Sequence, residues 1–543
     1  MATRRVREKV KPYLPGAKTL DLSTLRNWLW DAACKIRGPV DAPRYKDYIL
    51  PLIFIKRVSD VFEDEVERLA KELMQTKEKA AQIAENDHSL VRFFLPKESR
   101  WSELIKVRSG LGQRLTDAMR AFVKQNPSLE GVLDTIDFNA TAAGQRVVTD
   151  DHLAEVMQVL NKHRLGLYDV QPDIIGDAYE YLIAKFQAGS GQSAGEYYTP
   201  RQVARLMAKL LDVQPGMEVY DPCCGSFSLA IKAHLELLER CGKERNGHWE
   251  LPAKVPPVKL HGQEILAATY AMAKMNAFIH QVEADIRLGD TMNHPRFLET
   301  DGGLKKFDRV IANPMWNQDA FRQQTYENDT YGRFIYGIPP NSTADWGWIQ
   351  HMLASLKPNG RTVVIIDTGA ASRGSGNQGS DRERDIRKKI VEANLVEMVI
   401  LMPSNIFANM SGPSVIMVLH KSPPPLGAKR EEEGAGGGGS VLMINASREC
   451  EKGRPKNELT EKNIERIAEA GLSRGEIEAF SKLVPLFEIA KNDFNLSPSR
   501  YVSNGAAEDI LPLEEAVVLL KEAEEERAEA DERLRNLLGA LGL

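Results

Sequence analysis

A hydrophobic segment followed by a polar turn at residues 307–316 could hold a flat ring that carries an amino group. Phe307–Ala312 is short, apolar and rich in β-branched residues, which predicts a buried parallel strand. It ends in Asn313-Pro314-Met315-Trp316. The Asn313 side-chain oxygen and the Pro314 carbonyl can accept hydrogen bonds from an amino group, and Trp316 can stack on the ring. Taken alone, these residues are equally consistent with a strand that ends in a proline turn beside a partly buried tryptophan.

Polar groups also follow three other predicted strands. Asp221-Pro-Cys-Cys-Gly-Ser-Phe-Ser228 opens a helix, and Gly225 would supply the unusual dihedrals that let backbone N–H groups approach a ligand. Glu264 ends the next strand, where an acidic side chain can accept from both hydroxyls of a ribose. Asp290 follows the third strand and suits an exocyclic amine. Alone, each of the last two is typical of an ordinary turn at a strand end.

A helix start lies upstream of these strands, in Glu196-Tyr-Tyr-Thr-Pro-Arg201. The pattern predicts Thr199 as the N-cap and Pro200 as the first helical residue. Because the N–H groups of a helix N-terminus can hold a carboxylate, this segment is a candidate binding site. An ordinary capped helix is the alternative.

These motifs are positioned by alternating strands and helices. Such alternation predicts an open, largely parallel sheet covered on both faces, with ligands at the carboxyl ends of the strands. Seven strands are predicted, at 217–221, 258–264, 284–290, 309–312, 361–367, 395–402 and 414–420.

The first part of the chain is predicted to be helical. Leu25, Trp28, Leu29 and Ala32 follow helical spacing, and a second helix is expected to begin near Ile49. We expect an acidic outer face where this second helix continues through residues 59–69.

The composition limits the classes of protein. With 543 residues the chain should hold several domains, and 43% hydrophobic with 27% charged residues is typical of a globular protein without a membrane span. Five cysteines without C-x-x-C spacing predict neither a metal site nor a disulfide scaffold and fit a reducing cytoplasm. The net charge of −5 predicts that any DNA binding uses a local basic face or a partner, and we favour the partner.

Together the motifs are similar to those of one enzyme family. Asn313–Trp316 resembles the Asn-Pro-Pro-aromatic motif of amino-directed DNA methyltransferases, and 221–228 resembles their Asp-Pro-x-x-Gly-Ser-Gly motif. Residues 29–38, 45–60, 348–366, 386–403 and 405–421 look like segments of type I restriction–modification methylation subunits. The resemblance implies the class I methyltransferase fold, S-adenosylmethionine as cofactor and adenine N6 as the target.

The resemblance also implies which residues form the site. Asn313, Pro314 and Trp316 would be catalytic, the last as the stacking partner of a flipped adenine, and no metal is expected. The cofactor residues would be Glu196, Tyr197, Tyr198, Thr199, Pro200, Arg201, Asp221, Gly225, Ser226, Phe227, Ser228, Glu264 and Asp290. Two positions depart from the family: Phe227 replaces a glycine, which argues against close backbone approach there, and Met315 replaces a proline.

We predict four parts: a basic arm (1–20), a helical domain (21–165), a catalytic domain (166–485) with a low-complexity loop (422–440) between two strands, and a tail (486–543). The tail helix places apolar residues at coiled-coil spacing between 516 and 541. A terminal helix packed on its own domain is the alternative. The implied partners are double-stranded DNA, a specificity subunit bound through the tail, and a second copy of the chain. Whether a restriction subunit also binds is left open.

Two rival functions remain at this point. Glutamine-N5 protein methyltransferases also use an Asn-Pro-Pro-Tyr motif to hold an amide, although the long helical domain and the tail argue against them. A scaffold subunit that lost activity through Phe227 and Met315 is the other.

Overall fold

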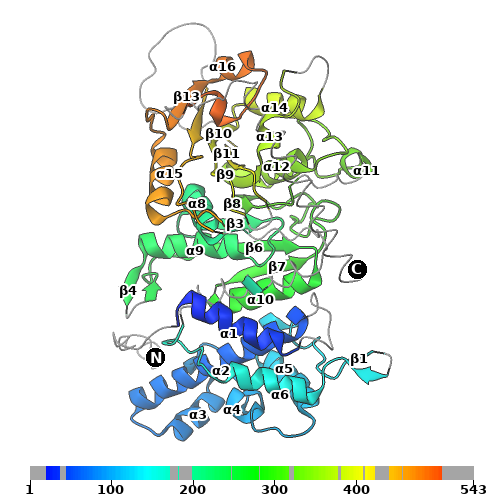
Figure 1. Cartoon of the computed structure of the whole chain (residues 1–543), viewed down its shortest axis with the longest axis vertical. Helices are drawn as coiled ribbons and strands as arrows, with labels where there is room; N and C mark the ends of the chain where they lie inside the picture. The colour runs from blue at the N-terminus through cyan, green and yellow to red at the C-terminus, as the bar shows by residue number, and fades with distance from the viewer. Residues whose placement is uncertain are drawn as a thin grey trace, which may run out of the picture.

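The computed structural model describes most of the chain. The described residues are 20–36, 45–142, 144–170, 181–182, 199–245, 248–280, 282–316, 323–376, 381–407, 410–421, 439–454 and 456–503. Four predictions lie outside them: nearly all of the basic arm, the residues Glu196, Tyr197 and Tyr198, nearly all of the low-complexity loop, and the coiled-coil tail. Figure 1 shows the helical domain at one end of the long axis and the large sheet beyond it.

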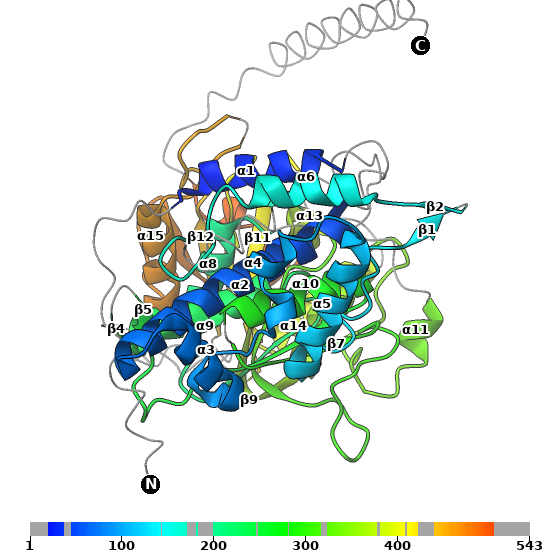
Figure 2. The ribbon, with the colours of Figure 1, turned by 90° about the horizontal axis from the view of Figure 1, so that it is seen from below.

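The helical domain has the predicted core. Leu25, Trp28, Leu29 and Ala32 are all buried on one face of the first helix. Helices α1 and α6 run side by side (Figure 2), and a two-residue hairpin precedes α6. The helices are α1 (Leu22–Cys34), α2 (Tyr45–Leu73), α3 (Lys77–Asn86), α4 (Trp101–Leu104), α5 (Leu111–Gln125) and α6 (Asp150–Leu160), and the hairpin is β1 (Thr141–Ala142) and β2 (Gln145–Arg146).

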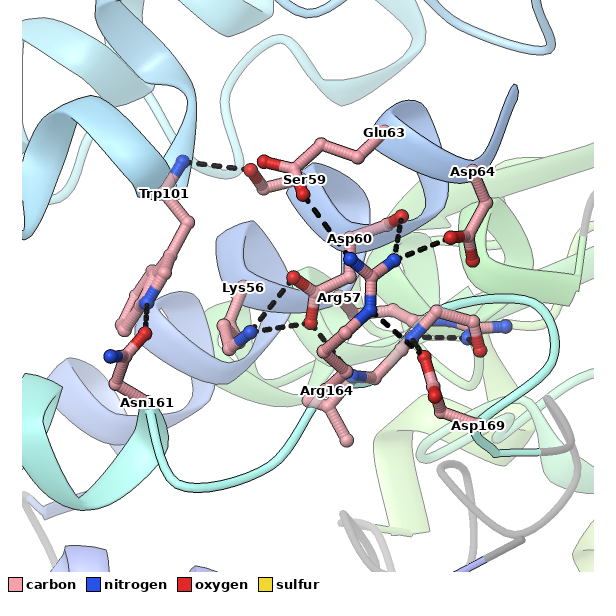
Figure 3. A network of polar contacts seen from close by, with 12 residues as sticks. Lys56, Arg57, Ser59, Asp60, Glu63, Asp64, Trp101, Asn161, Arg164 and Asp169 are labelled. Carbon is pink, nitrogen blue, oxygen red and sulfur yellow. Dashed lines mark hydrogen bonds and ion pairs between the residues drawn. The ribbon is translucent and has the colours of Figure 1, made fainter. Parts of the chain in front are cut away.

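The expected acidic outer face of α2 is only partly present: Glu63 and Glu67 are partly exposed, whereas Asp60 and Glu65 are buried. Asp60 accepts two hydrogen bonds from Lys56 and one from the Leu165 N–H (2.7 Å). Arg57 donates to the carbonyls of Leu165 and Gly166. Figure 3 shows these side chains turned toward the segment that leaves the domain, and Asp64 also accepts from a backbone N–H there. Helix periodicity marks one face as polar, but it does not show that another segment covers that face.

The second part of the chain forms one nine-stranded sheet with strand order β13-β12-β10-β11-β9-β8-β3-β6-β7. Strands β9, β8, β3, β6 and β7 are parallel to one another, and β11 is antiparallel to both β9 and β10. The strands are β3 (Glu218–Asp221), β6 (Lys259–Glu264), β7 (Ala284–Leu288), β8 (Phe307–Ala312), β9 (Leu356–Asp367), β10 (Val396–Leu401), β11 (Ser414–His420), β12 (Ser440–Asn445) and β13 (Ser481–Pro485).

The seven predicted strands are present, and β12 and β13 extend the sheet beyond them. As expected, the low-complexity loop separates two strands, β11 and β12. Strand β13 is not among the predicted strands. A five-residue strand flanked by charged residues carries too weak a period-2 signal to stand out from the preceding helix.

Helices cover both faces of the sheet. Successive residues of β9 illustrate this, since Val363 and Ile365 belong to one core and Val364 and Ile366 to the other. The first core also contains α8 (Arg201–Leu211), α9 (Ser228–Cys241), α10 (Ala267–His280) and α15 (Glu461–Ser473). The second contains α12 (Asp345–Ala354), α13 (Thr368–Ser372), α14 (Arg382–Glu392) and α16 (Leu486–Lys491). A small hairpin, β4 (Lys243–Arg245) and β5 (His248–Glu250), follows α9.

Helix α10 joins the helical domain to the sheet (Figure 1). Its Met272, Met275 and Ile279 belong to the core of the helical domain, whereas its Ala273 and Ala277 belong to a core of the sheet. Phe278 contacts the rings of Phe54, Phe93 and Phe122. The two parts therefore share a buried interface.

The described helices include none that is both long and apolar enough to cross a lipid bilayer.

Candidate active site

The predicted site residues meet at one edge of the sheet. Asp221, Glu264 and Asn313 end or follow β3, β6 and β8, and Asp290 lies two residues after β7. These four strands are consecutive neighbours in the order β8-β3-β6-β7, and they are parallel, so their carboxyl ends meet at the same edge.

The turn after β3 is bonded directly to the end of β6. The Gly225 N–H donates to Glu264 Oε2 (3.0 Å), and the Leu266 N–H donates to Oε1 (2.8 Å). Gly225 has a φ of 52°, the left-handed conformation that its lack of a Cβ permits. A carboxylate oxygen has more than one acceptor direction, so Glu264 can still accept from a ligand hydroxyl.

Phe227 does not obstruct this turn, contrary to the expectation from the missing glycine. Its φ of 67° is left-handed, as a glycine would allow, yet its ring is fully buried while Gly225, Ser226 and Ser228 are half-buried. The ring lies over Gly262 of β6, where an added Cβ would come within 2.6 Å of Phe227 Cε2. The absence of a side chain at Gly262 therefore accommodates the ring in the core, away from the backbone N–H groups of the turn.

Asp221 is held in a dry environment. Its side chain is almost fully buried and accepts from the Cys223 N–H (3.1 Å). Burial raises the pKa of Asp221 to about 8, and the negative charge of Glu264 adds to the rise. In the ligand-free protein this carboxyl group is therefore largely protonated near neutral pH.

Asp290 lies beside a cavity of about 450 Å³. Its carboxylate accepts from the N–H groups of Met292 (2.9 Å) and Asn293 (3.0 Å) in its own turn. The other lining residues come from the same turn and from the segment after the Asn-Pro motif: Met292, Asn293, His294, Gln324, Thr325, Asn328, Asp329, Thr330, Tyr331 and Arg333. The predicted partner of an exocyclic amine thus borders a space large enough for a heterocycle.

The polar segment after the Asn-Pro motif packs against the turn that follows β7. It contains α11 (Gln323–Glu327). Arg333 is buried, pairs with Asp329 (2.7 Å) and donates to the Met292 carbonyl (2.7 Å). Sequence reasoning missed Arg333, because a single arginine in a polar stretch gives no signal of burial.

Thr199 and Asn313 are brought together from positions 114 residues apart, and Thr199 is not the N-cap that the sequence predicted. Helix α8 begins at Arg201, and its N-cap is Pro200, which makes no side-chain capping bond. The Thr199 hydroxyl instead accepts from Asn313 Nδ2 (2.8 Å). A local sequence pattern could not reveal this partner, because Asn313 follows β8, 114 residues further along the chain.

Trp316 is also bonded to Asn313. Its indole N–H donates to Asn313 Oδ1 (2.9 Å) and to the Ile365 carbonyl (3.0 Å). The side chain is 4% exposed, and its ring meets that of Phe407 edge-on at 4.7 Å. In this conformation little of the ring is open to a base, so stacking on adenine stays a prediction. Pro314 is buried and Met315 half-buried; nothing in the structure explains why methionine stands at 315.

This strand order, with acidic side chains after β3, β6 and β7 and an Asn-Pro turn after β8, defines a class I S-adenosylmethionine-dependent methyltransferase. The residues also fit the cofactor: Glu264 can accept from ribose hydroxyls, Asp290 borders the cavity, and the turn at Gly225 is free of a blocking side chain.

Comparisons with known proteins give the family. The N-6 DNA methylase family matches residues 170–509, and the HsdM N-terminal domain family matches residues 25–160. The type I restriction enzyme MjaVII methylase subunit of Methanocaldococcus jannaschii is 30% identical over 541 residues, covering 96% of this chain and 85% of that protein. The HindI methylase subunit of Haemophilus influenzae is 30% identical over 481 residues, covering 82% of this chain and 100% of that protein.

A solved structure agrees with these matches. The crystal structure of a type I restriction–modification methyltransferase subunit from Streptococcus thermophilus superposes with a TM-score of 0.70 at 26% identity, covering 89% of this chain and 100% of that one. The chain therefore belongs to the N-6 DNA methylases, among the type I restriction enzyme methylase subunits. It is an S-adenosylmethionine-dependent DNA adenine methyltransferase, and the predicted fold class, cofactor and activity are confirmed.

Proposed function

We propose that the chain methylates N6 of an adenine flipped out of double-stranded DNA, with Asn313 and Pro314 as the catalytic residues. The observation that carries this proposal is the place of the Asn313 amide. It follows β8, next to the strand that ends in Asp221 and two strands from Glu264. The cofactor supplies an electrophilic methyl group on a sulfonium.

The proposed chemistry depends on how the amino group is held. The adenine amine is a poor nucleophile, because its lone pair is shared with the ring. Asn313 Oδ1 and the Pro314 carbonyl would accept its two N–H bonds and favour a lone pair localised on nitrogen. Such fixed acceptors act by positioning and by electrostatic stabilisation. Because the amine cannot be reached inside a duplex, the base must leave the stack first.

The cofactor would be held by the residues around the turn at Gly225. Glu264 is assigned to the ribose and Asp290 to the adenine of the cofactor. Ser226 and Ser228 are assigned as small side chains that line the cofactor site beside these two residues. Thr199, Pro200 and Arg201 stand at the start of α8, with Glu196, Tyr197 and Tyr198 just before it in the sequence.

The assembly belongs to the same proposal. We expect a specificity subunit to bind the tail helix and a second copy of the chain to join the complex. The complex is expected to act in the cytoplasm. Whether a restriction subunit binds as well is left open. The chain's net charge of −5 supports a partner that supplies much of the DNA contact. The similar proteins named above are methylase subunits of type I restriction enzymes.

The test is transfer of labelled methyl from S-adenosylmethionine to DNA, with and without the specificity subunit. Asn313→Ala is expected to lower the rate at least 100-fold, the order expected when a transition-state contact is lost. Asn126→Ala is the matched control, because it removes another hydrogen-bonded asparagine, whose side chain donates to the Phe94 and Phe122 carbonyls in the helical domain. Transfer by Asn313→Ala at the wild-type rate would refute the catalytic assignment.

A further inference from the structure

The Asn313 amide is held from both sides by two buried side chains. Its Nδ2 donates to Thr199 Oγ1 at 2.8 Å, and its Oδ1 accepts from Trp316 Nε1 at 2.9 Å. Thr199 is 9% exposed and Trp316 4% exposed, so water competes little for either bond. Asn313 as a whole is only half-buried, so the residue is not sealed off from a substrate.

The chemistry of the two partners determines which way the amide faces. An indole N–H can only donate, so the amide atom beside Trp316 must be the oxygen. The NH2 group then faces Thr199, whose hydroxyl oxygen accepts. Reversing the amide would set its NH2 group against the indole N–H, donor against donor. The Trp316 N–H cannot easily turn away, because it is also bonded to the Ile365 carbonyl of β9.

This orientation is the one that methylation of an amine requires. An amide oxygen has two acceptor directions, and Trp316 uses one of them. The second remains for an N–H of the adenine amino group. A reversed amide would present a donor to that amino group and could not hold it.

We infer that Thr199 and Trp316 are positioning residues that fix the acceptor oxygen of Asn313 toward the target amine. The inference rests on the proposed function, since it assumes that Asn313 binds the amine. It reassigns Thr199 from cofactor binding to catalysis through Asn313, and it assigns Trp316 a role through its N–H rather than through stacking. Since Thr199 lies two residues before α8, its hydrogen bond joins the segment predicted to bind cofactor to the catalytic turn.

The test uses the full chain assembled with its specificity subunit. Thr199→Val keeps the shape of the side chain but removes the acceptor. We expect a fall in kcat of about 10- to 100-fold, the scale of a misplaced reacting group, with the Kd for S-adenosylmethionine within about twofold of wild type. Thr199→Ser retains a hydroxyl and should restore most of the rate. Thr116→Val is the matched control, because it removes another buried threonine hydroxyl, bonded to the Gly112 carbonyl, far from the site.

Trp316→Phe separates the two roles of the tryptophan. It keeps an aromatic ring but removes the N–H. If the hydrogen bond positions Asn313, kcat should fall. If only ring stacking matters, kcat should stay near the wild-type value. This variant also carries the test if Thr199→Val fails to fold. The inference is overturned if both variants keep the wild-type kcat, or if Thr199→Val weakens cofactor binding as much as it slows methylation. Because Asn313→Ala is measured in the same assay, failure of the catalytic assignment would be seen separately.

Discussion

At the scale of single residues, a bulky side chain in the cofactor turn is accommodated by a glycine on the next strand. The Phe227 ring occupies the space in which a Cβ on Gly262 would lie, and the same Cβ would meet Cys224 Sγ at 3.0 Å. The pair explains how the turn after β3 keeps its shape without the second glycine of the family motif.

This pairing predicts the effect of Gly262→Ala. Overpacking a core site typically costs about 1–3 kcal/mol, so the free energy of unfolding should fall by this amount. The turn should also shift and weaken cofactor binding. Gly412→Ala is the control, since an added Cβ there meets nothing within 4 Å. Denaturant titration and equilibrium binding of S-adenosylmethionine measure both effects, and Phe227→Leu in the Gly262→Ala background should recover part of the loss. Unchanged stability in Gly262→Ala would contradict the packing argument.

The buried carboxyl group of Asp221 predicts a pH dependence of stability in the ligand-free protein. Its folded pKa, about 8, lies above the ordinary value of 3.8. Between these values the folded state keeps a proton that the unfolded state has released, so the free energy of unfolding falls as pH rises through this window. Above about pH 8 the contribution is lost. Asp221→Asn cannot titrate, so the difference in stability between wild type and variant should change between pH 5 and pH 9. A difference that stays constant would show that Asp221 is ionised throughout.

At the scale of elements, helix α2 binds the segment that leaves the helical domain. Gly166 lies so close to Asp64 and Asp169 that an added Cβ would fall within 3 Å of either carboxylate. Arg164 pairs with both of these carboxylates, and Leu20 donates to the Asp169 carbonyl (3.1 Å). Charged groups of α2 thus fix the backbone of residues 164–170 at the point where the helical domain ends.

Arg57→Ala tests this arrangement. It would remove the Arg57 hydrogen bonds to the Leu165 and Gly166 carbonyls and one buried positive charge beside Asp60 and Asp64, which keep only Lys56 and Arg164 as ion-pair partners among the described residues. Removing one member of a buried charge network typically costs about 3–5 kcal/mol, which urea denaturation of the helical domain would detect. Lys71→Ala breaks the exposed pair with Glu67 and should cost at most about 1 kcal/mol. Equal losses in the two variants would mean that burial adds nothing to the Arg57 contacts.

At the scale of the whole molecule, residues 20–503 contain both parts of the structure and the helix that joins them. In the sequence, helix α10 lies between Glu264 and Asp290. The side of this helix that faces away from the sheet packs on the helical domain. Its Asn276 also donates to the Ser226 carbonyl (3.0 Å), so the interface between the two parts reaches the cofactor turn through one helix.

A chain that ends at residue 503 should therefore still bind S-adenosylmethionine but no longer assemble with the specificity subunit. The removed part carries the predicted apolar seam and none of the described site residues. Co-purification with the specificity subunit and equilibrium dialysis with the cofactor measure the two properties. In the full-length chain, Leu534→Asp should repeat the loss of assembly, whereas Glu525→Ala, off the seam, should not. Normal assembly of the shortened chain would place the contact elsewhere.

The sequence by itself determined the order of strands along the chain, the helical first domain and the polar residues that end the strands. These features follow from local periodicity and from turn residues, which each segment carries within itself. Because parallel strands end at one edge, Asp221, Glu264, Asp290 and Asn313 could be expected together before the fold was known.

Only the tertiary structure decided which hydrogen bonds these residues make. Thr199 accepts from Asn313 instead of capping α8, Phe227 turns inward because Gly262 leaves room, and Asp60 is buried because residues 164–170 cover it. Each outcome depends on a partner far away in the chain. A local pattern specifies the side chain that needs a partner, whereas the packing of distant segments decides which partner it meets.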